Sequence, residues 1–232
     1  MIEPKVPSCP NTVARRRFGR EQARICYPST EQASVGDVTA VITALNDATD
    51  IPYCLDRLTR QEAIAQIIVV DRGSVDDTQW IVGVYSSITE KIRLITEPGL
   101  ELVAARNLGF DAADSDIIGH LRPDARVEFD WARTTSRHLS THPETAAVTR
   151  TNLTHIGLKI PTADADRQTR HRSQIFDLAA GWPCGANLAI RRSVWLEIRD
   201  TSVTVSVPWA DLDLALCLRR QGRRVDQLVP LC

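Results

Sequence analysis

Several features that would identify a membrane protein or a disulfide-rich protein are missing from this sequence of 232 residues. No run of about 18 apolar residues is present, so we expect no membrane-spanning helix. The N-terminus has no apolar core of the kind that a signal peptide needs. The six cysteines form no C-x-x-C pair, which argues against a zinc site and against a disulfide scaffold. We therefore expect reduced thiols and a cytoplasmic location.

Net charge and motif content exclude further classes of protein. The formal net charge is −1, which gives no general attraction to nucleic acid. No G-x-G-x-x-G follows the first predicted strand, and no G-x-x-x-x-G-K-S/T occurs, which disfavours an NAD enzyme and a P-loop ATPase. A G-x-S-x-G motif is missing as well, which disfavours an α/β-hydrolase.

Residues 1–36 differ in pattern from the rest of the chain. They are rich in proline at their start and show little hydrophobic periodicity. We predict a flexible or peripheral extension here, followed by a single domain over residues 37–232. The arginines between Arg15 and Arg24 form a basic cluster, which is either a solvated surface or a contact for phosphate or for an anionic lipid surface.

From Val38 onward, apolar β-rich segments alternate with amphipathic segments. Strands are predicted for VTAVITAL, AQIIVVD, KIRLITE, DIIGHL and TAAVTRT, and the nearly all-apolar VTAVITAL suits a strand buried on both faces. Strand and helix alternate with short connections, which predicts an α/β fold with a mostly parallel central sheet and helices on both faces.

Three aspartates lie just past predicted strand ends: Asp47, Asp71 and Asp124. Ligands bind at the carboxyl ends of the strands in such sheets, so this placement indicates a site. Aspartate is also a common turn and helix-cap residue, which is the alternative explanation for each of them.

Five segments, in order, resemble motifs of the family 2 glycosyltransferases, which have the GT-A fold. They are VTAVITALND, IIVVDRGSVDDT, AARNLGFDAADSDIIGHLRPD, GANLAIRRSVW and WADLDLALCLRRQGRRV, and they span Val38 to Pro230. The resemblance implies a nucleotide-binding half at residues 37–128 and an acceptor half at residues 129–232. It also implies transfer of a sugar, with inversion, from a UDP- or GDP-linked donor to a hydroxyl of an unknown acceptor.

The resemblance assigns residues to donor binding. Asn46 and Asp47 match the strand-end pair near the nucleotide, and Asp71 matches the first acid of a turn that contacts the base or ribose. Arg72 replaces the second acid of that turn, and Arg106 matches a helix that flanks the donor. We predict that all five contribute to donor binding.

The D-x-D motif, which normally binds Mn²⁺ or Mg²⁺ in this family, is altered. Arg122 replaces its first acid and Pro123 its middle residue, whereas Asp124 keeps the usual metal ligand. We predict that Arg122 and Asp124 bind the donor. Asp124 is the predicted ligand of a divalent metal, whose binding the positive charge of Arg122 would oppose. Arg122 is either a fixed replacement for the metal, a solvent-facing side chain or a mark of lost catalysis.

The acceptor motif is partly kept. Asp211 matches the catalytic base, with stabilisation of a helix start as its alternative role, and Asp213 matches the next acid, while Ala210 replaces a glutamate. We predict that Asp213 and Trp209 contact the acceptor, with a packing role as the alternative for the tryptophan. The replaced acids leave an alternative function, a catalytically inactive GT-A-like binding or scaffold module. Peripheral contact with the inner face of the membrane, or with a partner protein, is left open.

Overall fold

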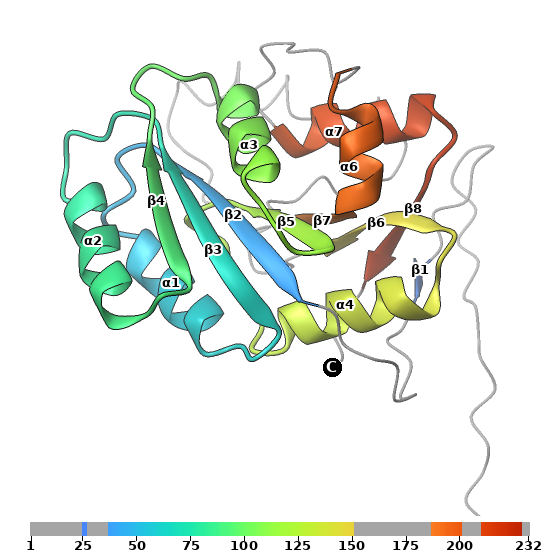
Figure 1. Cartoon of the computed structure of the whole chain (residues 1–232), viewed down its shortest axis with the longest axis horizontal. Coiled ribbons are helices and arrows are strands. Elements are labelled where there is room, and N and C mark those ends of the chain that lie inside the picture. Colours follow the sequence, from blue (N-terminus) through green and yellow to red (C-terminus); the bar gives the residue numbers. More distant parts are fainter. Residues whose placement is uncertain (1–24, 27–36, 151–186, 201–209, 229–232) are drawn as a thin grey trace, which may run out of the picture.

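The computed structural model describes residues 25–26, 37–150, 187–200 and 210–228. In these ranges eight strands form one sheet, with helices on both of its faces (Figure 1). The predicted α/β class and the mostly parallel sheet are confirmed. No helix in the described part of the chain is long and apolar enough to cross a membrane.

The strands follow the order β1-β8-β6-β7-β5-β2-β3-β4 across the sheet. Neighbouring strands are parallel, except that β7 runs antiparallel to both β5 and β6. Their bounds are β1 Ile25–Cys26, β2 Val38–Ala44, β3 Ile64–Asp71, β4 Ile92–Thr96, β5 Ile117–Leu121, β6 Thr145–Arg150, β7 Asn187–Arg191 and β8 Arg224–Leu228.

The short strand β1 lies inside the predicted N-terminal extension. It pairs with β8 at the edge of the sheet, where Ile25 stands opposite Gln227. The rest of the predicted extension, including the arginine cluster, lies outside the described residues. The division of the chain into an extension and one domain with two halves stays a prediction.

Six helices of the described ranges cover the two faces of the sheet, three on each (Figure 1). One face carries α1 (Ile51–Thr59), α2 (Thr78–Ile88) and α4 (Trp131–Thr141). The other carries α3 (Leu102–Asp111), α6 (Arg192–Ile198) and α7 (Ala210–Arg220). All residues of β2 are buried, because side chains on both of its faces enter a core. This is why β2 shows a continuous apolar run instead of alternation.

A glycine in β5 lets a tryptophan of α4 pack directly on the sheet. A Cβ at Gly119 would lie 2.5 Å from Cη2 of Trp131. Trp131 is fully buried, and its Nε1 donates a hydrogen bond of 2.6 Å to Oδ1 of Asn187. This bond joins α4 to the start of β7, where Asn187 stands opposite Leu121 at the end of β5.

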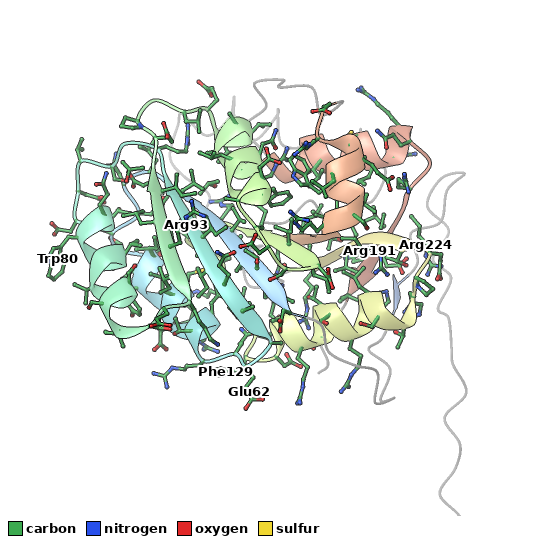
Figure 2. The ribbon with its side chains drawn as sticks, viewed as in Figure 1. Glu62, Trp80, Arg93, Phe129, Arg191 and Arg224 are labelled. Atoms are coloured by element: carbon green, nitrogen blue, oxygen red, sulfur yellow. The ribbon has the colours of Figure 1, made fainter. Side chains whose placement is uncertain are left out.

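A charged network lies at the edge where β6 and β8 begin. The buried carboxylate of Asp226 accepts hydrogen bonds from Oγ1 of Thr145 at 2.7 Å and from Arg224 at 2.9 Å, and it lies 2.9 Å from Nε2 of His138. Arg191 donates to the carbonyl of Thr145, and Figure 2 places Arg191 and Arg224 at this side of the sheet. The network joins α4 to β6 and β8, away from the carboxyl ends of the parallel strands.

Candidate functional site

Strands β3, β2 and β5 end side by side, which gathers polar side chains along one edge. Ala44 of β2 stands opposite Asp71, and Ile42 of β2 stands opposite Leu121. The segments that follow these strands carry Asn46 and Asp47, Arg72, and Arg122 and Asp124. The structure therefore brings these predicted residues to one end of the sheet, as expected for a ligand site of a parallel sheet.

The turn after β3 is built around the carboxylate of Asp71, which is inaccessible to solvent. Its Oδ1 accepts hydrogen bonds of 3.0 Å from the backbone N–H groups of Gly73 and Ser74 and one of 2.8 Å from Nε2 of Gln79. Its Oδ2 accepts a bond from the hydroxyl of Ser74. Asp71 thus sets the shape of the turn from inside. Its contact with a nucleotide stays a prediction.

Gly73 is required by the same turn. Its φ is +102°, a backbone conformation that residues with a Cβ rarely adopt. A Cβ at Gly73 would also lie 3.1 Å from Cα of Pro98 in the loop after β4. The glycine therefore lets the turn and that loop approach each other.

The turn after β2 is joined to the turn after β3 by hydrogen bonds. Asn46 has a φ of +58°, which asparagine tolerates better than most residues. Its backbone N–H donates to Oγ of Ser74 at 2.9 Å, and its Oδ1 accepts from the N–H of Val75 at 2.9 Å. The N–H of Asp47 donates to Oγ1 of Thr78 at 2.9 Å. The two turns therefore form one cross-linked unit.

Asp47 belongs to an electrostatic cluster with Arg122 and Asp124. Burial raises the pKa of the Asp47 carboxyl, and the charges of Asp124 and Asp50 raise it further. A hydrogen bond of 2.7 Å from the N–H of Leu45 and the charge of Arg122 act in the opposite direction. Arg122 and Asp124 are thus close enough to Asp47 to influence the ionisation of its carboxyl.

The segment after β5 forms a turn in which Arg122 points at Asp124. Nη2 of Arg122 donates a hydrogen bond of 2.8 Å to Oδ2 of Asp124, and the N–H of Ala125 donates to the carbonyl of Arg122 at 2.9 Å. The Arg122 side chain is 44% exposed and the Asp124 side chain 29%. Burial raises the pKa of the Cys54 thiol to about 12, with a smaller contribution from the charge of Asp124. Cys54 of α1 therefore lies within electrostatic range of this turn.

Two predicted donor-binding arginines are engaged by the protein itself. Nε of Arg72 donates a hydrogen bond of 2.7 Å to the carbonyl of Leu100, which directs the side chain toward the loop after β4. Arg106 in α3 is fully buried, and its Nη2 donates to Oδ1 of Asn107 at 2.7 Å. Its guanidinium also lies 5.9 Å from the ring centroid of Phe110. Donor binding by these two residues stays a prediction.

The predicted acceptor residues are only partly described. The backbone of Asp211 and Asp213 lies in the first turn of α7, and Trp209 lies outside the described residues. Helix α7 packs on β8 and connects to it through a short turn at Gly222, so helix and strand run in opposite directions. The first turn of α7 therefore points toward the edge at which the parallel strands end.

The sequence analysis did not single out two further residues that the structure associates with this edge. Gln79, in the first turn of α2, reaches back to Asp71, and nothing in its local sequence pattern indicates this contact. Arg150 ends β6 and is 3% exposed, with its Nη1 at 3.4 Å from Oε2 of Glu128. Arg150 could have been identified from the sequence, because it is a charged residue at the end of a predicted strand.

The charge of Arg122 opposes a divalent metal at Asp124. Within the described residues, no group of three or more His, Cys, Asp or Glu side chains could hold a metal ion. A divalent ion at about 5 Å from the Arg122 guanidinium would be repelled by roughly 7 kcal/mol at an effective dielectric of about 20. Solvent reduces this repulsion, because Arg122 is 44% exposed, and the carboxylates of Asp47 and Asp124 act in the opposite direction.

Comparison with known proteins places the chain in a family. The model of the family described as Glycosyl transferase family 2 matches residues 39–195, which is more than half of the chain. The glycosyltransferase AglE of Haloferax volcanii is 29% identical over 98 residues, which are 40% of this chain and 32% of AglE. The chain thus spans a minor part of the length of this relative.

Two solved structures are similar in fold. The mannosyltransferase PcManGT from Pyrobaculum calidifontis, in complex with GDP-Man and Mn²⁺, has a TM-score of 0.63 at 19% identity, covering 85% of this chain and 57% of that chain. Glucosyl-3-phosphoglycerate synthase from Mycobacterium tuberculosis, in complex with Mn²⁺, UDP-glucose and phosphoglyceric acid, has a TM-score of 0.61 at 16% identity, covering 84% and 69%. With the family match and this shared fold, the chain belongs to glycosyl transferase family 2 and has the GT-A fold.

Proposed function

We propose that this chain transfers a sugar from a UDP- or GDP-linked donor to an acceptor hydroxyl with inversion. The observation that supports it best is the shared edge, where the cross-linked turns after β2 and β3 adjoin the Arg122–Asp124 turn. Such an edge can hold a nucleotide on one side and a diphosphate on the other. Family membership supplies the sugar-transfer chemistry.

The proposed division of roles follows the charges. The diphosphate leaving group gains negative charge as the sugar departs, so a positive group must lie beside it. Arg122 is the cation at this edge that the turn after β5 holds in place. The turns that carry Asn46, Asp47 and Asp71 are assigned to the nucleoside.

The acceptor hydroxyl must lose a proton to a positioned base, and we assign this role to Asp211. Its backbone position in the first turn of α7 is compatible with the role, because that turn points toward the edge described above. Asp213 and Trp209 are assigned to the acceptor. An inverting reaction needs the base and the leaving group on opposite sides of the sugar, so Asp211 and Arg122 would flank the transferred group.

The test combines binding with turnover. Calorimetry with UDP and GDP measures donor binding, and incubation with UDP- and GDP-sugars measures hydrolysis or transfer, with the anomeric configuration of the product read by NMR. We expect Asp211→Asn to lower turnover about 10²- to 10⁴-fold while leaving nucleotide affinity within about threefold of wild type. The matched control is Asp200→Asn, which changes an exposed aspartate just after α6.

The competing function is a binding or scaffold module without catalysis. The ion pair at Asp124 is the observation that favours it, because it engages the acid that the family motif assigns to metal. That function predicts nucleotide binding without turnover for every donor sugar. Turnover that Asp211→Asn removes and Asp200→Asn retains would decide for the enzyme. The absence of nucleotide binding would rule out the proposed transferase. A cytoplasmic location and a peripheral membrane or protein partner stay predictions of the sequence.

A further inference from the structure

The turn after β5 holds a permanent cation at the position of the altered metal motif. Pro123 is buried and fixes its own φ, and it disfavours helical backbone at Arg122. The hydrogen bond from the Ala125 N–H to the Arg122 carbonyl closes the turn. The ion pair of 2.8 Å with Asp124 then orients the guanidinium. Backbone and side-chain contacts therefore both constrain where this positive charge lies.

We propose that the Arg122 guanidinium takes the place of a divalent metal and binds the donor diphosphate directly, so that donor binding needs no metal ion. This inference rests on the proposed function. A guanidinium is planar, stays charged at all working pH values and forks onto phosphate oxygens. With five N–H donors, it can hold a carboxylate and a phosphate at the same time.

The charge of Arg122 itself opposes a metal ion at this turn. The guanidinium of Arg122 lies 2.8 Å from the carboxylate of Asp124, and the turn that carries Asp47 follows β2, the strand next to β5 at this edge of the sheet. A second cation brought to this cluster would be repelled by Arg122, whereas an anionic phosphate would be attracted to it. Mn²⁺ is present in the complexes of the two structures compared above, whereas the proposal for this chain is donor binding without a metal ion.

The first measurement uses the wild-type protein alone. UDP and GDP are titrated by calorimetry in excess EDTA and again in Mn²⁺ after exhaustive removal of EDTA. We expect the dissociation constant of the preferred nucleotide to agree within about threefold between the two conditions. Binding that is at least about tenfold tighter in Mn²⁺ overturns the inference and leaves the proposed function standing. No binding of either nucleotide in both conditions overturns the inference and the proposed function together.

The second measurement uses variants of the same turn. Arg122→Ala should weaken nucleotide binding about ten- to a hundredfold in EDTA, the range that a hydrogen bond to a charged group accounts for. Arg122→Asp should bind the nucleotide weakly in EDTA, and its affinity should increase at least about tenfold in Mn²⁺. The substitution supplies a second acid beside Asp124 and removes the repulsion between Arg122 and the metal ion. Circular dichroism and a melting curve check that each variant is folded.

The matched control is Arg126→Asp, which makes the same charge change farther along the segment that leads to α4. Arg126 is exposed, and its guanidinium lies 4.8 Å from the ring centroid of Tyr53. The Arg126→Asp variant should retain wild-type nucleotide affinity in EDTA, and its affinity should not increase in Mn²⁺. Equal losses of nucleotide affinity in Arg122→Asp and Arg126→Asp would mean that the overall charge of this region attracts the nucleotide, and not a positioned guanidinium. The inference would then be wrong.

Discussion

Replacing Asp71 by alanine tests whether one buried carboxylate holds the turn after β3 in shape. The substitution removes the acceptor of four hydrogen bonds, from two backbone N–H groups, the Ser74 hydroxyl and the Gln79 amide. Because Asn46 is bonded to Ser74 and Val75, the disturbance should extend to the turn after β2. Stability and nucleotide affinity should therefore fall together.

The magnitude follows from the number and exposure of the donors. A hydrogen bond to a charged group contributes about 1.5–3 kcal/mol, and such contributions do not add within one network. Gly73, Ser74 and Gln79 are only partly buried, so water can replace part of what is lost. We expect a loss of about 3 kcal/mol in the free energy of unfolding, which corresponds to a melting temperature lower by about 6–12 °C for a chain of this size.

Calorimetric or fluorescence-monitored melting measures this change, and calorimetry with UDP and GDP measures the accompanying loss of affinity. The matched control is Asp77→Ala, because Asp77 precedes α2, is exposed and makes no side-chain cap hydrogen bond. That control should cost about 1 kcal/mol or less. A melting temperature for Asp71→Ala within about 2 °C of the control would refute the argument that Asp71 organises the turn.

Three further predictions concern packing, pH and backbone strain. Gly119→Ala forces a Cβ to within 2.5 Å of Trp131 and should cost about 1–3 kcal/mol, measured by denaturant unfolding. Burial raises the pKa of Asp226, but hydrogen bonds from His138, Arg224 and Thr145 outweigh it and hold the pKa well below its ordinary value. The stability that Asp226 contributes is therefore present above about pH 4 and lost as the pH falls toward the folded-state pKa. Asp226→Asn should lower stability at pH 7 by about 3 kcal/mol and flatten the acid limb of a melting-temperature profile; an unchanged limb would contradict this. Asn46→Ala should destabilise the protein by about 1 kcal/mol more than Asn46→Gly, because only glycine relieves the positive φ, and equal losses would argue against strain.

Secondary structure was largely determined by local sequence. The predicted strands at VTAVITAL and AQIIVVD became β2 and β3, because β-branched apolar runs bounded by polar turns have few other stable conformations. Gly222 follows α7 with a φ of +67°, a conformation that glycine adopts readily at the end of a helix. Short connections between parallel strands then required helices on the faces of the sheet.

Strand order depended on contacts between segments far apart in the chain. β7 lies between β5 and β6 and is antiparallel to both, and β1 joins the sheet next to β8. Pairing energies between such distant segments leave no periodic signature in either segment. The local pattern therefore predicted a mostly parallel sheet but could not supply its order.

The sequence by itself determined that acids and arginines would follow the strand ends, because the strand boundaries and the residue types are both local. Only the tertiary structure decided what those side chains do. Arg72 donates to Leu100, Asp71 is enclosed by its own turn, and Arg122 lies against Asp124. Each outcome is set by hydrogen-bond partners and burial that exist only after the turns are brought together, since a side chain in a turn takes its direction from its neighbours in space.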